Sequence, residues 1–376
     1  MKSLYLFNPE NDLALACNRR NYSPPRNALE LRRSGALLPL WYCTAGDAVL
    51  VESMPDTCWL DAIRGKFGID TSVVTAVPDE VVRAVPWGWS LAARSEFLAA
   101  GMREELLPDE ECIRSMRELS HRRLTVSILD GMKSHGLYHG ELPVELHNSV
   151  DVLHILNTYG NDGIYLKAPW SSTGRGVIPG SGKSDDNIMM QAAGIIKRQG
   201  SVMVEQAFRK VRDFAMLFRS APGVGVRYVG LSLFDTSSQS YTGNILASES
   251  RLRNILSGDI STEDTDRVRE AIIPLLDNLI GDRYEGYFGV DMMVVDINGQ
   301  HHIHPCVEVN LRMTMGVVAH KFTRNYLADD VTGTFRVEFG ETAEATEPVI
   351  VDGKLVRGTL RLVPSGGKFS ITATVS

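Results

Sequence analysis

The stretch Gly289-Val-Asp-Met-Met-Val-Val-Asp-Ile297, followed by Asn298-Gly299 and the run Gln300–Leu311, decides the fold of this chain. Both runs are rich in strand-forming residues. Asn-Gly between two such runs is the strongest short-range signal for a β-hairpin. We therefore expect two antiparallel strands joined by a two-residue turn.

The hairpin gathers oxygen-bearing side chains on one face. With a two-residue turn, Asp291 faces Cys306, and the alternation of side chains places Glu308 and Asn310 on the same face. Two carboxylates and an amide oxygen repel one another unless a cation lies between them, and hard oxygen ligands of this kind suit Mg²⁺. An exposed polar sheet face is the alternative, and Pro305 can shift the register.

A second motif, Lys167-Ala-Pro-Trp-Ser-Ser-Thr-Gly-Arg-Gly-Val177, places a lysine at the end of a predicted strand, before a loop rich in glycine and serine. The loop offers backbone N–H groups that can approach anionic oxygens, which predicts a phosphate-binding loop. It matches neither the P-loop nor the dinucleotide-binding glycine pattern. An ordinary surface loop is the alternative.

A third motif is Val202-Met-Val-Glu-Gln-Ala-Phe208, with Asp213 after it. It predicts a buried strand that ends at Glu205 and runs into a linker. Such a linker can hold adenine through its backbone, and the later carboxylate can bind ribose hydroxyls. A strand that merely ends in an exposed Glu is the alternative.

The rest of the chain predicts a mixed α/β and α+β protein. Short apolar runs alternate with helix-like segments over roughly the first 115 residues, which favours an α/β unit with a parallel sheet. These runs are Ser3–Asn8, Leu37–Cys43, Ala48–Val51 and Ser72–Val77. We expect domains at 1–118, 119–205 and 206–335, and a C-terminal β extension at 336–376.

Composition narrows the class of protein. The 376 residues include 39 Lys and Arg against 46 Asp and Glu, and this acidic balance argues against a nucleic-acid partner. The N-terminus lacks a signal-peptide pattern, and no apolar run reaches the roughly 18 residues of a spanning helix. Five separated cysteines without a C-x-x-C pair favour a reducing compartment. We expect a cytoplasmic protein with no membrane partner.

The order of the three motifs resembles that of the ATP-grasp superfamily, the fold of D-alanine:D-alanine ligase, biotin carboxylase and glutathione synthetase. The resemblance covers roughly residues 120–320 and is strongest in Gly289-Val290-Asp291 and Glu308-Val309-Asn310-Leu311-Arg312. It implies two β-rich lobes that hold ATP between them, after an N-terminal α/β domain. It also implies a ligase that joins a carboxylate to an amine or thiol through an acyl phosphate.

The resemblance also implies a role for each motif residue. Lys167 would contact the α- and β-phosphates, and the triphosphate would be covered by Ser171, Ser172, Thr173, Gly174, Arg175 and Gly176. Adenine would be held by Glu205, Gln206, Ala207 and Phe208, and ribose by Asp213. Mg²⁺, or Mn²⁺, would be bound by Asp291, Glu308 and Asn310. Arg312 would face the transferred phosphate or the substrate carboxylate.

Two features depart from the family pattern. The usual lysine near the start of the central lobe is replaced by Arg122 and Arg123, which keep the positive charge. The usual ribose acid is Glu, whereas Asp213 is one methylene shorter. Neither change removes the predicted metal ligands, so we expect an active enzyme.

Two further candidate sites lie outside these motifs. Arg251 and Arg253 can reach the γ-phosphate or the substrate acid from a loop, and a solvated helix start is the alternative. The segment Asn8-Pro-Glu-Asn-Asp12, with Arg19 and Arg20, follows the first strand, where open α/β sheets bind ligands. It is our candidate for recognition of a small-molecule substrate.

Two other functions fit the same motifs. An ATP-grasp-like kinase would phosphorylate a small molecule without a ligation step, and a non-catalytic module would bind ATP without turnover. A module that only senses ATP has no need of the metal ligands together with Arg312, which disfavours it. The acid, the amine and the oligomeric state are not specified by the sequence.

Overall fold

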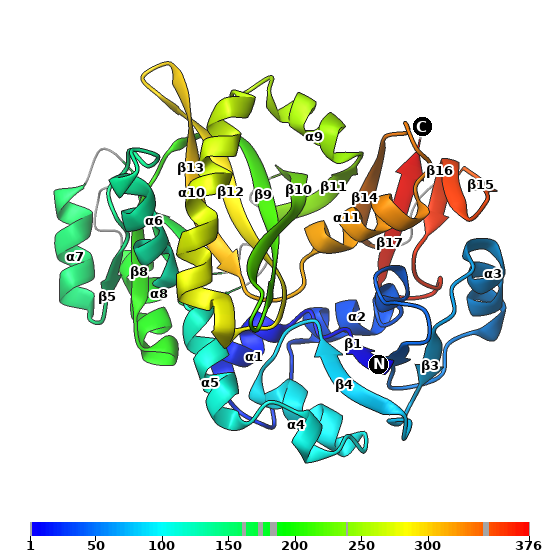
Figure 1. The fold of residues 1–376 in the computed structure, drawn as a ribbon. Coiled ribbons are helices and arrows are strands. Elements are labelled where there is room, and N and C mark those ends of the chain that lie inside the picture. The colour runs from blue at the N-terminus through cyan, green and yellow to red at the C-terminus, as the bar shows by residue number, and fades with distance from the viewer. Residues whose placement is uncertain are drawn as a thin grey trace.

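The computed structural model describes residues 2–159, 163–171, 176–180, 186–237, 240–340 and 346–375. Three β-sheets organise these residues (Figure 1). The mixed α/β and α+β class predicted from the sequence is confirmed.

The N-terminal part is an α/β unit. Its parallel sheet has the order β3-β2-β1-β4, formed by β1 (Lys2–Leu6), β2 (Ala48–Leu50), β3 (Ser72–Val74) and β4 (Val81–Pro86). The accompanying helices are α1 (Asn11–Cys17), α2 (Arg26–Ser34), α3 (Thr57–Phe67), α4 (Leu91–Ala99), α5 (Glu110–Leu119) and the 3₁₀ helix η2 (Glu104–Leu106). The carboxyl ends of β1 and β4 therefore lie side by side.

One apolar run predicted as part of the alternating pattern is not a strand. Within Leu37–Cys43 the chain forms the 3₁₀ helix η1 (Leu38–Trp41). Pro39 lacks the N–H that a sheet ladder needs and has a φ suited to a helical turn. Trp41 is fully buried there, and its indole Nε1 donates to the Leu362 carbonyl at 2.7 Å, which ties the N-terminal lobe to the C-terminal strands.

A small lobe is built on an antiparallel sheet of order β5-β8-β6-β7. Its elements are β5 (Val144–Leu146), α7 (Ser149–Thr158), β6 (Ile164–Lys167), β7 (Val177–Gly180), α8 (Asp186–Gln199) and β8 (Val202–Gln206). Leu166, Ile178 and Val204 face α7 and α8 and form the apolar core of this lobe. The alternation of side chains then places Lys167 and Glu205 on the opposite face.

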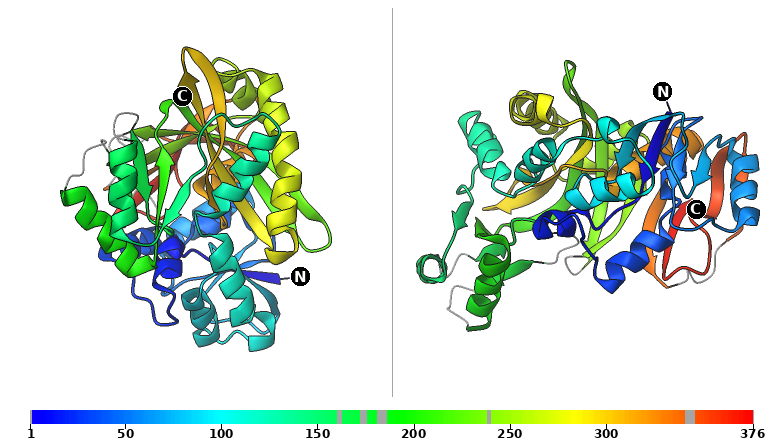
Figure 2. Two further views of the ribbon diagram at one scale, coloured as in Figure 1. Left: turned by 90° about the vertical axis from the view of Figure 1, so that its left-hand side faces the viewer. Right: turned by 90° about the horizontal axis from the view of Figure 1, so that it is seen from below.

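The third sheet has nine strands in the order β13-β12-β9-β10-β11-β14-β17-β16-β15. Its strands are β9 (Arg209–Ala221), β10 (Gly225–Ser237), β11 (Ser240–Leu246), β12 (Gly286–Ile297), β13 (Gln300–Asn310), β14 (Gly333–Phe339), β15 (Val349–Val351), β16 (Lys354–Arg361) and β17 (Phe369–Val375). The boundary expected between residues 335 and 336 falls inside β14. The C-terminal strands thus continue the large sheet and lie beside the N-terminal lobe (Figures 1 and 2).

Helices cover the two faces of this large sheet. They are α6 (Leu124–Ser134), α9 (Glu249–Leu256), α10 (Thr262–Ile280), α11 (Met315–Tyr326) and the 3₁₀ helix η3 (Gly281–Arg283). Along β9, Phe214, Met216 and Phe218 belong to the core that includes α6 and α10. The alternating residues Ala215 and Leu217 belong to the core that includes α11. Polar residues that pair with Ala215 or Leu217 on the neighbouring strand therefore lie on the face of the sheet that α11 covers.

The predicted hairpin is confirmed, but its register is shifted. The pairing runs as expected from Ile297 opposite Gln300 to Met293 opposite His304, and then β13 carries extra residues, so that Asp291 faces Glu308 rather than Cys306. The irregularity contains Pro305, which has no N–H to donate to the ladder. The shift brings the two carboxylates directly opposite each other.

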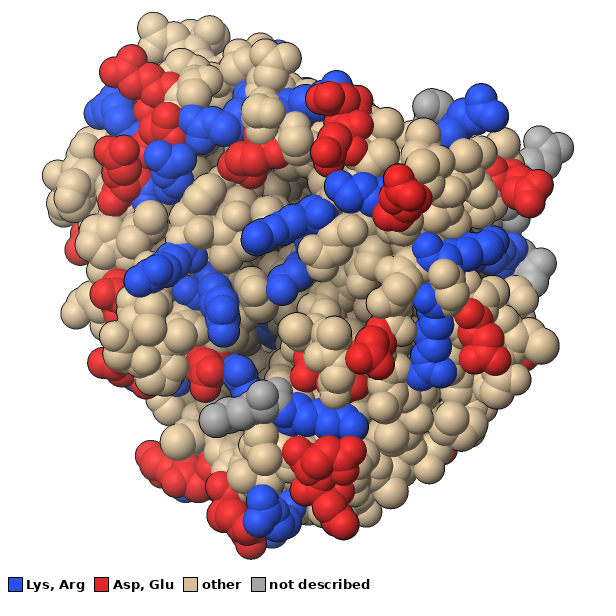
Figure 3. All heavy atoms as spheres, turned by 45° about the vertical axis from the view of Figure 1, so that its right-hand side comes forward, with Lys and Arg blue, Asp and Glu red and all other residues tan. Residues whose placement is uncertain are grey.

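Charge is mixed over the molecular surface. On the face shown in Figure 3, acidic and basic side chains are interspersed, and Lys and Arg side chains gather around a hollow near its centre. No helix in the described part of the chain is long and apolar enough to cross a membrane.

Candidate active site

The predicted metal ligands lie together on the α11 face of the large sheet. Asp291 faces Glu308 across the β12–β13 pair, and Asn310 donates from Nδ2 to Asp291 Oδ2 at 2.9 Å. Burial, followed by the nearby Glu308 carboxylate, raises the pKa of Asp291 to about 7. Two carboxylates and an amide oxygen form a donor set that fits Mg²⁺. Among the described residues, no three His, Cys, Asp or Glu side chains form a metal cluster.

The raised pKa of Asp291 predicts a pH effect on the metal-free protein. The folded state keeps the Asp291 proton up to about pH 7, whereas the unfolded chain releases it near 3.8, so stability falls as pH rises through this window. The slope contributed by Asp291 is up to about 1.4 kcal/mol per pH unit. Urea unfolding at several pH values in the presence of a chelator measures it. Asp291→Asn should flatten the curve relative to wild type, and identical curves would contradict the raised pKa.

Arg312 links the predicted metal ligands to the N-terminal lobe. Its Nη2 donates to Asn310 Oδ1 at 2.9 Å and to Asp12 Oδ2 at 2.7 Å, while Nε donates to the same Asp12 carboxylate at 2.9 Å. Both side chains of the ion pair are largely buried. Of the segment Asn8–Asp12 predicted for substrate recognition, Asp12 is thus brought next to the predicted metal ligands through Arg312.

Arg122 approaches the carboxylates from the other side. Its Nη2 lies 2.8 Å from Glu308 Oε1 and 3.0 Å from Ser171 Oγ, and its Nε donates to the Ala168 carbonyl at 3.0 Å. The side chain is buried between the small lobe and the large sheet. Arg123, which the sequence could not distinguish from it, is half-exposed and pairs with Glu118. Of these two arginines, Arg122 is the one that contacts other predicted residues in the described part of the chain.

Lys167 and Glu205 form a buried ion pair on the face of the small sheet opposite α7 and α8, with 2.5 Å between Nζ and Oε2. The second oxygen of Glu205, Oε1, is buried and has no hydrogen-bond partner in the described part of the chain. Nδ1 of His304 is likewise buried without a hydrogen-bond partner among the described residues, and the His304 ring packs against Tyr138 and Phe208. Burial lowers the pKa of His304 to about 4, so the imidazole is neutral at pH 7. Two buried polar atoms without partners among the described residues thus lie beside the predicted adenine linker.

The predicted phosphate loop is described only at its ends. Ser172, Thr173, Gly174 and Arg175 lie outside the described residues. Gly176 has φ +79°, and a Cβ there would come within 2.9 Å of Ala168 Cβ, so glycine is required where the loop returns to β7. The Ala168 amide donates to the Gly176 carbonyl at 2.8 Å and closes the loop.

Asp213, the predicted ribose ligand, lies on β9 opposite Met293, on the sheet face that carries Asp291. The Lys210 ammonium lies 2.6 Å from its Oδ2. Gln206 ends β8, and Ala207 and Phe208 form the short linker to β9. This order matches the predicted sequence of strand, linker and acid.

Several solved structures have this arrangement of sheets. N5-carboxyaminoimidazole synthetase from Staphylococcus aureus, complexed with ADP, matches with a TM-score of 0.52 at 11% identity, over 100% of this chain and 93% of that one. Biotin carboxylase from Campylobacter jejuni, in a complex with β,γ-ATP, matches with a TM-score of 0.54 at 12% identity, over 100% and 87%. No protein-family model and no curated sequence matches the chain. The protein has the ATP-grasp fold.

A third structure with the ATP-grasp fold is the biotin carboxylase domain of the 2-oxoglutarate carboxylase from Hydrogenobacter thermophilus, in complex with MgADP, ADP and bicarbonate. It matches with a TM-score of 0.53 at 11% identity, over 100% of this chain and 86% of that one. The resemblance seen in the motifs is therefore confirmed at the level of the fold. At such low identity the likeness does not extend to substrates.

Arg251 has no hydrogen bond or ion pair with the other predicted site residues that the structure describes, and its partners lie elsewhere. It lies on α9, where Nη1 donates to Thr332 Oγ1 at 3.0 Å and Nη2 pairs with Asp330. Its neighbour Arg253 is engaged by Asp266. In the described structure both arginines lie in the first turns of α9, as the alternative of a helix start predicted.

Sequence reasoning missed His304 and the partnership of Asp12 with Arg312. The alternation that placed Glu308 on the site face also predicts His304 on it, since the two lie four residues apart on one strand. No local signal pairs Asp12 with Arg312, because the two residues are 300 positions apart and meet only when the N-terminal lobe docks on the ATP-grasp lobes.

Proposed function

We propose that the protein is an ATP- and Mg²⁺-dependent ligase that joins a carboxylate to an amine through an acyl phosphate. One observation carries the proposal. A connected chain of polar contacts runs from Asp12 through Arg312 and Asn310 to the Asp291–Glu308 pair, and from there to Arg122, which contacts the small lobe. Groups from three lobes thus converge on one place, as a phosphoryl-transfer site between lobes requires.

The nucleotide would bind between the small lobe and the large sheet. Lys167 and Arg122 would contact its phosphates, and the buried, unpartnered Glu205 Oε1 and His304 Nδ1 would meet the edge of adenine. Gln206, Ala207 and Phe208 would supply backbone groups beside the ring, and Asp213 would bind ribose. The neutral state of His304 supports this role, because a neutral imidazole offers one donor and one acceptor without placing charge next to a base.

Asp291, Glu308 and Asn310 would hold Mg²⁺, which neutralises phosphate charge when bound. Arg122 is already paired with Glu308, so part of the acidic charge is balanced before any ligand enters. The Asn310 amide oxygen, which accepts from Arg312, would turn to the metal.

In the proposed reaction the substrate carboxylate attacks the γ-phosphorus, the bond to the β-phosphate oxygen breaks, and ADP leaves. The amine then attacks the acyl carbon, loses a proton, and expels phosphate to give the amide. Arg312 would bind the transferred phosphoryl group or the substrate acid, and Lys167 and Arg122 would stabilise charge that moves onto the leaving ADP. Asp12 would hold the Arg312 guanidinium in place.

Transfer of isotope tests the reaction class. A pool of small carboxylic acids labelled with oxygen-18 in the carboxyl group, a pool of amines, ATP and Mg²⁺ are incubated with the protein, and the phosphate formed is analysed by mass spectrometry. An acyl phosphate leaves one labelled oxygen in inorganic phosphate. ADP with a phosphorylated product and no inorganic phosphate would instead support the kinase alternative, and no turnover in any mixture would contradict both.

Lys167→Ala is expected to weaken ATP binding by about 1.5–3 kcal/mol, the value of a charge-assisted hydrogen bond. This corresponds to roughly a tenfold to hundredfold rise in Kd. Titration calorimetry with Mg-ATP measures the change. Lys197→Ala, which removes an exposed lysine near the end of α8, is the matched control and should bind as wild type does. Equal affinity in both variants would remove Lys167 from the nucleotide site.

A further inference from the structure

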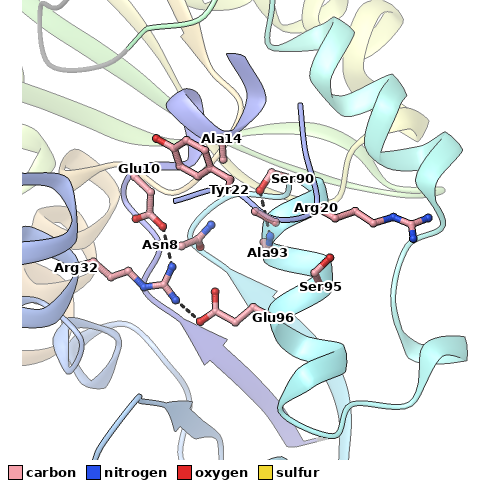
Figure 4. A pocket seen from close by; sticks show the side chains of 11 residues that line it. Asn8, Glu10, Ala14, Arg20, Tyr22, Arg32, Ser90, Ala93, Ser95 and Glu96 are labelled. Atoms are coloured by element: carbon pink, nitrogen blue, oxygen red, sulfur yellow. Dashed lines mark hydrogen bonds and ion pairs between the residues drawn. The ribbon is translucent and has the colours of Figure 1, made fainter. Parts of the chain in front are cut away.

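A pocket of about 260 Å³ lies in the N-terminal lobe, at the carboxyl ends of β1 and β4. Asn8 and Glu10 line it from the segment after β1, Ser90 from the N-cap of α4, Glu96 from within α4, and Arg32 from α2 (Figure 4). In the sheet, β2 and β3 follow on one side of β1, whereas β4 lies on its other side, so the order of the strands reverses between β1 and β4. Open α/β sheets bind ligands at such a switch point.

Glu10 is the unusual residue of this pocket. Its side chain is only 5% exposed, and Oε1 accepts from Arg32 Nη1 at 2.7 Å. The other oxygen, Oε2, is buried and has no hydrogen-bond partner among the described residues. A buried carboxylate oxygen without a partner is costly, so a donor supplied by a ligand would stabilise it.

The neighbouring residues do not supply that donor. The Asn8 amide is used by the Gly88 backbone, with Nδ2 donating to its carbonyl at 2.9 Å. Arg32 divides its guanidinium between Glu10 and Glu96. Arg20 extends away from the pocket and pairs with Glu110 (Figure 4).

The charges of the pocket do not balance. Two carboxylates, Glu10 and Glu96, share the single guanidinium of Arg32. Burial raises the pKa of Glu96 even though Arg32 opposes the rise, and the Glu10 carboxylate adds to it. A cation in the pocket would restore the balance, whereas an anion would increase the repulsion.

We propose that this pocket binds a cationic nitrogen of the amine substrate, with Glu10 Oε2 accepting its N–H bond. The assignment to the amine substrate rests on the proposed ligase function. The small side chains of Ala14, Ala92 and Ala93 leave room for a compact aliphatic amine. Glu10 precedes α1 directly, and Asp12 in the first turn of the same helix holds Arg312, so the pocket adjoins the proposed reaction site.

Saturation-transfer difference NMR without ATP or Mg²⁺ tests the pocket on the intact protein. The probes are propane-1,3-diamine, agmatine and glycinamide, and the neutral control is propane-1,3-diol. We expect at least one cation to bind and the diol not to bind. Glu10→Gln should weaken cation binding by about tenfold or more, because it removes the charge and keeps the shape. Glu80→Gln, which alters an exposed carboxylate of the same lobe, should have no effect.

A second variant separates binding from folding. Ala92→Leu fills the pocket, leaves the Glu10–Arg32–Glu96 contacts in place and suits a helix, and it should abolish cation binding. The inference is overturned if none of the three cations binds, if the diol binds equally well, or if both variants bind as wild type does. Because no nucleotide is present, a failed ATP site would remove the role in ligation but not the cation binding. A protein that binds Mg-ATP and no cation would overturn the pocket alone.

Discussion

Glu308→Gln is expected to lower Mg²⁺-dependent ATP turnover about a thousandfold, a loss of several kcal/mol of transition-state stabilisation. The substitution keeps the volume of the side chain and removes one of the two carboxylates that face each other across the β12–β13 pair. It also weakens the contact with Arg122, the arginine that we propose to bind the phosphates. A coupled assay of ADP release with the substrates found by isotope transfer measures the effect.

The control for this loss is Glu338→Gln, which changes a carboxylate on β14 of the same sheet that pairs with Arg336. Its turnover and its melting temperature should equal those of wild type. Asp291→Asn should reproduce the loss seen in Glu308→Gln. Retained turnover in both site variants would show that the metal ligands lie elsewhere.

The second large effect is on stability. Arg312→Met is expected to lower the free energy of unfolding by about 3 kcal/mol, because it leaves Asp12 as an uncompensated charge in a largely buried place. Urea unfolding followed by circular dichroism measures the change.

The double variant Asp12→Asn/Arg312→Met separates two effects: the loss of the ion pair and the cost of leaving the Asp12 charge buried without a partner. It should recover most of the stability that the single Arg312→Met variant loses, while ATP turnover remains low because the guanidinium is still missing. A double variant less stable than either single variant would mean that the residues contribute independently. The ion pair would then not explain the docking of the N-terminal lobe on the ATP-grasp lobes.

Local signals predicted the elements that depend on local chemistry. The Asn298-Gly299 turn and its flanking β-type runs predicted the β12–β13 hairpin. The strand β4 (Val81–Pro86) escaped notice because half of its side chains are not buried and its partner, β1, is far away in sequence. The pairing of β11 with β14, which joins the C-terminal strands to the large sheet, likewise has no local signal.

The candidate site, like the fold, could be predicted only where local sequence patterns determine it. The alternation of side chains along a strand was enough to predict Asp291, Glu308 and Asn310 on one face. The pairing of Asp291 with Glu308 depends on extra residues in β13 around Pro305, and strict alternation does not predict such an irregularity. Arg122 and Arg123 are neighbours of the same type, and only the packing of the small lobe on the large sheet decides which one is buried.

The central claim is a nucleotide site that needs Mg²⁺ and is built on the Asp291–Glu308 pair. Thermal melting of wild type and Glu308→Gln, each with and without ATP and Mg²⁺, tests it most directly, because a ligand of the folded state must raise the melting temperature. We predict that ATP stabilises the wild type only when Mg²⁺ is present, and that Glu308→Gln loses this stabilisation. No stabilisation of the wild type, or equal stabilisation of both proteins, would contradict the account.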